Sequence, residues 1–319
     1  MKRFLISFLS LAALFGVLLV AALLFMPYDK KFGYQLFKGD DLVKTRWVYC
    51  RLFESNEPID VAFVGTSHTY FGINDTLIAE ELRGQLGEDI KVANLAFPGR
   101  GRNHHLTIIE DLLEQKKPEV IVLEVMEHEA RSSHDVSGAI ASSGQLASIL
   151  HPTNLKLVRD VSTYYNTRKR YLQYLLGAEE ALIECGEAGA RSFAVEDTIL
   201  TRQQAEKALT HLESVRKPIY LSEDQWDIEF AFPLSILNRI IDRCEEEGVE
   251  LIFLYNPYYT APATPAPYFT AFYKEHGTLL TPPKAIFDNH TYWFDGDHLN
   301  ARGNTLMSAW VAEQLSELL

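Results

Sequence analysis

The three residue types that acyl transfer requires occur in two short motifs far apart in the chain. Ser67 lies in V-G-T-S-H after an apolar run, and Asp295 and His298 lie in F-D-G-D-H-L-N before the last helical pattern. A serine hydroxyl is a poor nucleophile unless an imidazole takes its proton and a carboxylate orients that imidazole. Residues i and i+3 of a tight turn can face each other, so Asp295 can orient His298. The pattern predicts a Ser67–His298–Asp295 triad.

Each of these residues also has a structural interpretation. A serine before a helix is commonly an N-cap. Asp295 can cap its own turn, and the nearby Asp297 competes with it for the imidazole. His298 can be structural, but its polar neighbours Asp297 and Asn300 are typical of a site. We expect Ser67 to be the nucleophile, and the spacing favours Asp295 as the partner of His298.

Short apolar runs alternate with helical patterns along most of the chain. Runs that are apolar at consecutive positions are typical of parallel strands covered by helices on both faces. Strands are expected at 59–64, 90–95, 120–125, 250–255 and, as a last short strand, 285–287. Helices are expected at 40–52, 74–86, 103–115, 234–247 and from the N-cap Asn300 to about 318, with Asn74 as a second N-cap. The sequence predicts a three-layer α/β/α sandwich with a mostly parallel sheet.

A segment at about 136–217 interrupts this alternation and is expected to be a helical insertion. It carries a dense group of aromatic residues, namely Tyr164, Tyr165, Tyr171 and Tyr174. Tyrosines can line a carbohydrate-binding groove, but aromatic side chains more commonly form packed helix faces. Both interpretations stay open, and packing is favoured.

The N-terminus differs from the rest of the chain. Residues 4–26 carry no charge, and at about 1.5 Å per residue a helix of this length crosses the roughly 30 Å hydrocarbon core of a bilayer. No small-x-small cleavage site follows, so we interpret the segment as a retained anchor. Lys2 and Arg3 favour a cytoplasmic N-terminus, although Lys30 and Lys31 add positive charge beyond the anchor. We expect a single-pass protein of the inner (cytoplasmic) membrane, with lipid around residues 4–26 and a periplasmic catalytic domain.

The composition narrows the classes of function. The chain has 319 residues, 47% hydrophobic and 23% charged, as is ordinary for a globular protein. A net charge of −13 argues against a nucleic-acid partner, because phosphate binding depends on Lys and Arg. Cys50, Cys185 and Cys244 are too few and too scattered for a disulfide framework or a zinc ribbon. One disulfide with one free thiol and three free thiols both stay open.

The motifs, in their order, resemble those of the SGNH, or GDSL-like, hydrolase superfamily of ester hydrolases and acyltransferases, whose fold is an α/β/α sandwich. Gly65–His68 resembles the first block, with G-T-S where the family has G-D-S. Asn94–Gly99 resembles the second block, whose glycine donates a backbone N–H to the oxyanion, and the resemblance gives that role to Gly99. Asp295–Asn300 resembles the last block. The oxyanion hole would therefore combine the N–H groups of Ser67 and Gly99, although Gly99 can also be only a turn glycine.

The third block departs from the family pattern. The family has G-x-N-D, whose Asn completes the oxyanion hole, whereas this chain has V-M-E-H-E after the run at 120–125. His128 falls about where the Asn lies, and an imidazole N–H can donate to an oxyanion. Glu124, Glu127 and His128 also suggest a metal site, but no H-E-x-x-H motif is present. No metal or other cofactor is expected.

The resemblance covers about 57–135 and 217–319, and it implies a membrane-anchored serine esterase or O-acyltransferase. Its substrates would be acyl, above all acetyl, esters of cell-envelope or exported polysaccharide, and its partner a membrane-bound acyltransferase. A catalytically degenerate binding or scaffold subunit is one alternative. A lipase or thioesterase is another, against which the polar and aromatic segment at 256–268 argues. We expect an anchor at 1–26, a juxtamembrane connector at 27–57 and a catalytic domain at 58–319.

Overall fold

The computed structural model describes residues 2–36, 40–126, 129–148, 150–177, 197–215 and 223–319. Within these residues, the sheet has five strands that are all parallel, which confirms the predicted α/β class. In the spatial order β2-β1-β3-β4-β5, the strands are β2 (Val92–Asn94), β1 (Val61–Val64), β3 (Val120–Val125), β4 (Glu250–Tyr255) and β5 (Thr278–Leu280). The order reverses between β1 and β3. In doubly wound sheets, ligands bind in the crevice beyond the carboxyl ends of the strands at such a point.

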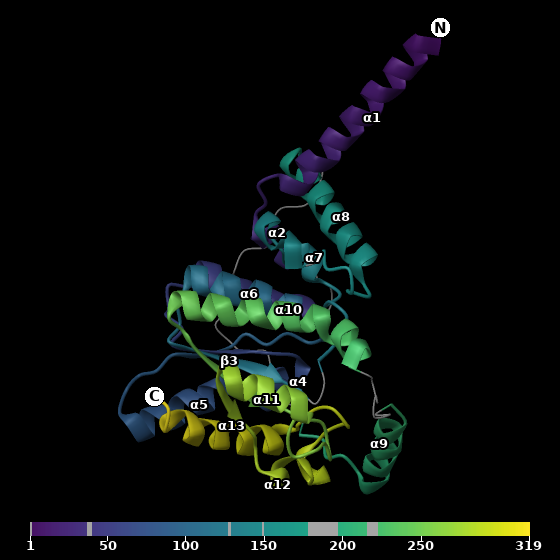
Figure 1. The fold of residues 1–319 in the computed structure, drawn as a ribbon. Helices are drawn as coiled ribbons and strands as arrows, with labels where there is room; N and C mark the ends of the chain where they lie inside the picture. Colours follow the sequence, from purple (N-terminus) through teal and green to yellow (C-terminus); the bar gives the residue numbers. More distant parts are fainter. Residues whose placement is uncertain (1, 37–39, 127–128, 149, 178–196, 216–222) are drawn as a thin grey trace.

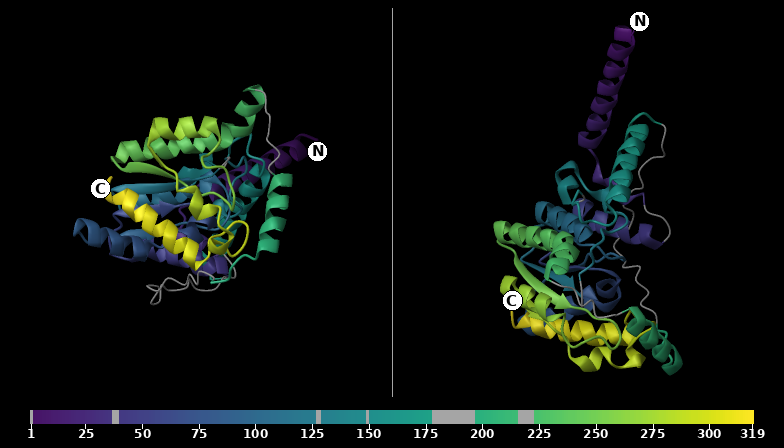
Figure 2. Two further views of the ribbon diagram at one scale, coloured as in Figure 1. Left: turned by 90° about the horizontal axis from the view of Figure 1, so that it is seen from below. Right: turned by 45° about the vertical axis from the view of Figure 1, so that its right-hand side comes forward.

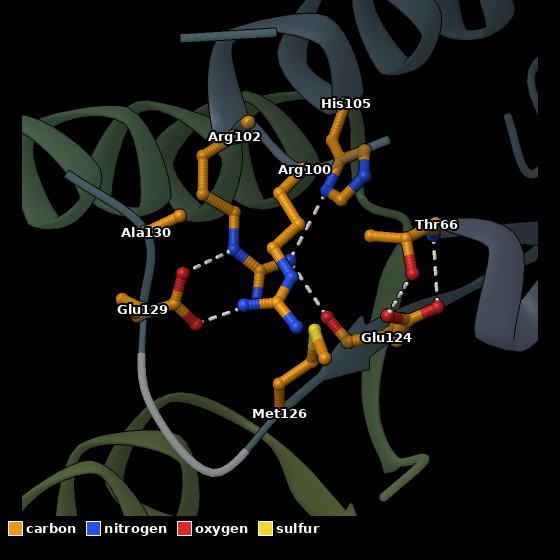
Figure 3. Close-up of a pocket in the computed structure, with 9 residues that line it drawn as sticks. Thr66, Arg100, Arg102, His105, Glu124, Met126, Glu129 and Ala130 are labelled. Atoms are coloured by element: carbon orange, nitrogen blue, oxygen red, sulfur yellow. Dashed lines mark hydrogen bonds and ion pairs between the residues drawn. The ribbon is translucent and has the colours of Figure 1, made fainter. Parts of the chain in front are cut away.

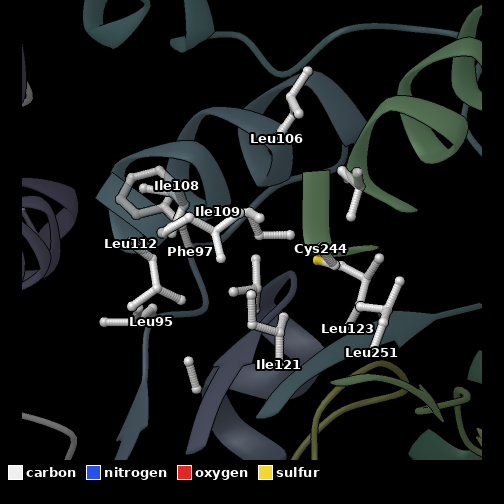
Figure 4. Close-up of a cluster of buried hydrophobic side chains, with 14 of the residues drawn as sticks. Leu95, Phe97, Leu106, Ile108, Ile109, Leu112, Ile121, Leu123, Cys244 and Leu251 are labelled. Carbon is white, nitrogen blue, oxygen red and sulfur yellow. The ribbon is translucent and has the colours of Figure 1, made fainter. Parts of the chain in front are cut away.

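Helices cover both faces of this sheet (Figure 1). One face packs against α6 (Arg102–Gln115) and α10 (Glu223–Glu247), and the other against α5 (Asp75–Leu86) and α13 (Ala301–Ser316). Successive residues of a strand point to opposite faces. Ile121 and Leu123 of β3 thus lie in the cluster beneath α6 and α10 (Figure 4), whereas Val122 lies in the cluster with α5 and α13. Burial on both faces explains the continuous apolar run of this strand.

Most expected elements are present. β3 and β4 have the predicted bounds, and the Asn74 and Asn300 side chains cap α5 and α13 as predicted. α3 (Asp40–Tyr49) continues as the π-helix η1 (Cys50–Glu54). α10 begins well before the predicted start, because it runs through Pro233, a residue that more commonly marks a helix boundary. The buried Phe230 and Phe232 precede this proline and pack this part of α10 on the core.

The last predicted strand, 285–287, is wrong. These residues belong to α12 (Lys284–Phe287), and the edge strand β5 instead follows α11 (Pro267–His276). Pro283 precedes α12 with φ −55°, a value that suits the start of a helix. A three-residue apolar run does not by itself distinguish a strand from a helix turn. β5 lies so close to β4 that a Cβ atom at Gly277 would overlap the carbonyl oxygen of Leu251.

The helix α1 (Lys2–Phe25) stands away from the domain in every view (Figures 1 and 2). It is long and apolar enough to cross a membrane. The chain that follows is packed on the core. Tyr34, at the end of α2 (Lys30–Tyr34), and Val48 of α3 belong to the same apolar cluster as α6. Lys30 forms an ion pair with the buried Asp111 of α6.

The insertion contributes α7 (Ser137–Ile140), the 3₁₀ helix η2 (Ser143–Ser148), α8 (Leu157–Leu175) and α9 (Arg202–Val215). Its tyrosines pack α8 on the start of the chain. Tyr164 is fully buried and donates a hydrogen bond to the carbonyl oxygen of Leu24, and the ring of Tyr171 lies 5.2 Å from that of Tyr28. These contacts favour the packing interpretation of the tyrosines over a carbohydrate groove.

The cysteines differ in state. Cys50 is disulfide-bonded, whereas Cys244 is a free, buried thiol whose pKa burial raises to about 12. Cys185 lies outside the described residues. Of the two alternatives left open by the sequence, the one with three free thiols is therefore wrong.

Two glycine substitutions test the tight approach of β5 to β4. We expect Gly277→Ala to lower the free energy of unfolding by about 1–3 kcal/mol, because its methyl group overlaps the backbone of β4. Gly84→Ala is the matched control: nothing lies within 4 Å of the added Cβ on α5, and the better helix former should stabilise the protein by about 0.5–1 kcal/mol. Urea unfolding in detergent, followed by circular dichroism, measures both. A shift of the same sign in the two variants would contradict this packing.

Candidate active site

Ser67 is the first residue of α4 (Ser67–Gly72), a short helix that begins just after β1. Thr66 is the N-cap, and its side chain accepts a hydrogen bond from the backbone N–H of His68. The turn is tight, because a Cβ atom at Gly65 would overlap the side chain of Glu124. Gly65 thus lets the chain pass directly from strand to helix. Ser67 is left partly exposed at the carboxyl edge of the sheet.

The buried carboxylate of Glu124 in β3 holds the beginning of α4. Its Oε2 accepts hydrogen bonds from the backbone N–H groups of Thr66 at 2.8 Å and Thr69 at 3.0 Å, and from the Thr69 hydroxyl at 2.5 Å. Its Oε1 accepts from the Thr66 hydroxyl at 2.7 Å. Glu124 is only 1% exposed, so these bonds replace its hydration. Its negative charge also lies at a helix N-terminus, where the helix dipole stabilises an anion.

His298 and Asp295 lie together, as their spacing predicts. The Nδ1 atom of His298 is 2.9 Å from Oδ2 and 3.1 Å from Oδ1 of Asp295. Burial raises the pKa of Asp295, but hydrogen bonds from His298 and from the backbone N–H groups of Asp297 and His298 outweigh it, so this pKa is below its usual value. Asp295 is therefore ionised at neutral pH and keeps the proton of a neutral His298 on Nδ1. The other nitrogen, Nε2, is left to act as a base.

The helix α4 brings the serine turn next to this pair. The ring of His68, which follows Ser67, has its centroid 5.8 Å from that of His298, and the ring of Phe71 lies 4.9 Å away. Phe71 is one turn after Ser67 on the same face of α4. Among the described residues, no hydrogen bond joins the Ser67 hydroxyl to His298. Catalytic hydrogen bonds are often long before substrate binds and tighten in the complex.

The loop after β2 brings Gly99 towards the serine turn. The backbone N–H of Phe97 donates to the carbonyl oxygen of Gly65 at 2.9 Å, so this loop runs beside the end of β1. Gly99 has φ +108°, and a Cβ atom there would overlap the ring of His134. In the part of the chain that the structure describes, the N–H groups of Ser67 and Gly99 donate to no acceptor. An oxyanion hole needs such unpaired donors.

Three histidines are buried behind this loop. His134 donates from Nε2 to the carbonyl oxygen of Pro98 at 2.8 Å, and its ring stacks on that of His104 at 4.4 Å. Burial lowers the pKa of His134 to about 4 and the pKa values of His104 and His105 well below their usual range. All three are therefore neutral at pH 7. Neither ring nitrogen of His104 has a hydrogen-bond partner among the described residues.

Arg100 and Tyr258 form part of the rim. The Arg100 guanidinium donates to the Tyr258 hydroxyl at 2.7 Å, which joins the loops after β2 and β4. The Tyr258 ring contacts His68, whose Nδ1 donates to the carbonyl oxygen of Asn256 at 3.0 Å. Burial, together with the nearby His298, lowers the pKa of His68. His68 is therefore uncharged at neutral pH, and its ring forms one side of the site.

A buried ion pair holds Glu129 against α6 (Figure 3). Arg102 in α6 donates to both carboxylate oxygens of Glu129, at 2.6 and 2.5 Å, and to the carbonyl oxygen of Glu124 at 2.6 Å. Tyr273 adds a hydrogen bond to Glu129. A small pocket between this pair and Thr66 is lined by charged side chains together with uncharged ones such as Met126 and Ala130. His128, the expected third oxyanion donor, lies outside the described residues.

Sequence reasoning missed residues that position the site. The motifs suggest a role for Glu124 only in a metal site, although a single carboxylate within an apolar strand indicates a buried charge, which needs several hydrogen-bond donors. The resemblance includes Asn94 only as the first residue of the second block. Its side-chain amide donates to the carbonyl oxygens of Thr69 and Ile73 at 3.0 and 2.9 Å, so it holds the last turn of α4. The pairing of Arg102 left no pattern in the sequence.

No protein-family model matches the chain, and no curated protein sequence matches it. Function is therefore inferred from the geometry of the site and from the motifs that form it.

Substitution of Glu124 tests the hydrogen bonds that hold α4. We expect Glu124→Leu to lower the free energy of unfolding by about 2–6 kcal/mol, because two buried N–H groups lose their acceptor at about 1–3 kcal/mol each. Glu124→Gln is the matched control. Its amide oxygen can replace Oε2 and its NH₂ can donate to the Thr66 hydroxyl, so the loss should stay below about 2 kcal/mol. Equal losses in urea unfolding would contradict this role.

The buried histidines predict a loss of stability in acid. An unfolded histidine takes up a proton at a pH of about 6.5, whereas these three stay neutral until lower pH. Their contribution is fully present above a pH of about 6.5 and is lost as the pH falls, at about 1.4 kcal/mol per pH unit for each histidine. We expect His104→Leu to reduce the slope of unfolding free energy against pH by about 1.4 kcal/mol per pH unit, because one buried histidine is removed. Urea midpoints measured between about pH 5 and 7 test this, and a slope equal to that of the wild type would refute it.

Proposed function

We propose that this protein is a membrane-anchored, extracytoplasmic serine esterase or O-acyltransferase of the SGNH type. The observation that carries this proposal is the Asp295–His298 pair, whose imidazole lies against the helix that begins with Ser67. These groups lie at the carboxyl edge of the sheet, beside the crevice between β1 and β3 where α/β proteins bind ligands. The proposed substrates are acyl, above all acetyl, esters of cell-envelope or exported polysaccharide.

In the proposed mechanism, the Ser67 hydroxyl attacks the ester carbonyl while His298 Nε2 accepts its proton. Asp295 stabilises the imidazolium that forms, and the backbone N–H groups of Ser67 and Gly99 hold the tetrahedral oxygen. His298 then returns the proton to the leaving alcohol, which leaves an acyl group on Ser67. Water or a sugar hydroxyl attacks this acyl-enzyme in the second half of the reaction. His128 is proposed as a third donor to the oxyanion.

Two features support a location outside the cytoplasm. The helix α1 is suited to a single membrane crossing, with Lys2 and Arg3 favouring a cytoplasmic N-terminus. Cys50 is disulfide-bonded, and disulfides persist in oxidising compartments such as the periplasm. The proposed partner is a membrane-bound acyltransferase that supplies the acyl group.

The alternatives make different demands on the site. A lipase or thioesterase should have an apolar trench beside the serine, whereas the rim next to His68 carries the Arg100 guanidinium and the Tyr258 hydroxyl. A degenerate scaffold would not need unpaired N–H donors at Ser67 and Gly99. These features favour a polar ester and a working serine.

Active-site substitutions test the proposal. We expect Ser67→Ala and His298→Ala each to lower kcat/KM for p-nitrophenyl acetate at least about 10³-fold, and Asp295→Asn about 10²- to 10⁴-fold, because each removes one member of the triad. Ser162→Ala, on the exposed surface of α8, is the matched control and should retain full activity.

A fluorophosphonate probe gives a second readout, which does not depend on the substrate. It should label Ser67 in the wild type and in Ser162→Ala but not in Ser67→Ala. Labelling that survives in Ser67→Ala would remove this serine from the mechanism. A wild type that neither turns over the ester nor reacts with the probe would favour the scaffold alternative.

A further inference from the structure

The C-terminal part of α8 presents an apolar face that none of the described residues covers. Leu172 is 36% exposed, Leu175 56% and Leu176 75%. Leu172 and Leu176 follow Tyr165 and Lys169 at helical spacing, so the four share one side of the helix, and the exposed Leu175 lies at the end of the adjacent side, beyond Arg168 and Tyr171. Lys169 is exposed on this side. A face with leucines, an aromatic ring and a cation matches the interfacial region of a membrane.

This face lies near the level at which α1 leaves the domain. The described side chains of α1 from Arg3 to Val20 are exposed, and at about 1.5 Å per residue this stretch is about 27 Å long, close to the thickness of a hydrocarbon core. Burial begins immediately afterwards, with Leu23. The Tyr164 hydroxyl donates to the carbonyl oxygen of Leu24 at 2.9 Å, so α8 meets α1 at the end of its exposed stretch (Figure 1).

The orientation of α8 relative to α1 is fixed by aromatic packing. The guanidinium of Arg168 lies 3.9 Å from the ring centroid of Tyr28 and 3.7 Å from that of Tyr164. The rings of Tyr171 and Tyr174 lie 5.4 and 5.6 Å from that of Phe32. Tyr28, between α1 and α2, and Phe32 of α2 are thus packed on one side of α8. Its exposed side cannot turn away from the membrane without breaking these contacts.

We propose that the segment Lys169–Leu176 lies in the interface of the same bilayer that α1 crosses. Leu172, Leu175 and Leu176 would enter the boundary of the acyl chains, and Lys169 would extend to the phosphate groups of the lipids. Although the whole chain has a net charge of −13, the local positive charge of Lys169 favours anionic lipid headgroups at this position. This inference rests on the proposed membrane anchorage. It adds a second contact that fixes the tilt of the catalytic domain.

Site-specific fluorescence in reconstituted full-length protein tests this contact. Leu176→Cys is labelled with a thiol-reactive NBD fluorophore in vesicles of phosphatidylcholine and phosphatidylglycerol in equal parts. Cys50 is disulfide-bonded and Cys244 is buried, and the unsubstituted chain gives the background labelling. Val158→Cys, at the other end of α8 and 84% exposed, is the matched control. Phe15→Cys reports on the anchor itself.

Quenching by a lipid with a nitroxide high on its acyl chain is the readout. We expect the label at position 176 to be quenched at least about twofold more than the label at 158, and Lys169→Glu to reduce the difference. Equal quenching at 176 and 158, with strong quenching at 15, would overturn the interfacial contact but not the anchor. No quenching at 15 would refute the anchor and this inference together. Shielding of 176 from both the lipid quencher and aqueous iodide would show that a protein covers this face, which also overturns the proposal.

Discussion

One buried carboxylate, that of Glu124, determines which atoms of the serine turn are available for chemistry. A helix N-terminus offers several free N–H groups to any anion. Here Glu124 takes those of Thr66 and Thr69, and the Thr66 hydroxyl takes that of His68. The N–H of Ser67 alone is left unpaired within this described turn. The strand thus fixes the helix and leaves this donor free for the oxyanion role that the proposed mechanism assigns to it.

The surrounding loops add contacts of the same kind at the same edge of the sheet. The backbone N–H of Phe97 donates to the carbonyl oxygen of Gly65 and thereby holds the loop that carries Gly99 beside the end of β1. Asn94 holds the other end of α4. These contacts use backbone groups and an uncharged amide, so they position the loop and the helix without placing a charge between them. Preorganised dipoles of this kind cost little rearrangement during reaction.

The sequence predicted the parts of the site that depend on local spacing, and it missed those that depend on packing. Asp295 and His298 are three residues apart, and Asn300 caps the helix that follows, so short-range rules found them. Glu124 acts only because β1 and β3 are neighbours, which no local pattern reveals. The same reason explains β5, whose three residues become a strand through pairing with β4. The sequence predicts a strand at 285–287 where the structure has the helix Lys284–Phe287, because the apolar run is too short to show a helical or a strand period.

The packing of the chain just after α1 bears on how substrate would reach the site. A flexible linker would let the catalytic domain sample many heights above a bilayer. Here α1 passes almost directly into α2, whose Lys30 pairs with the buried Asp111 of α6. Tyr164 ties α8 to the carbonyl oxygen of Leu24 at the same point. Because these contacts are made by described residues on both sides of the junction, the distance from the anchor to Ser67 is set by packing. If the proposed function holds, the anchored protein would act on esters presented at one height above the bilayer, as a polymer leaving the membrane or a membrane-bound acyl donor would present them.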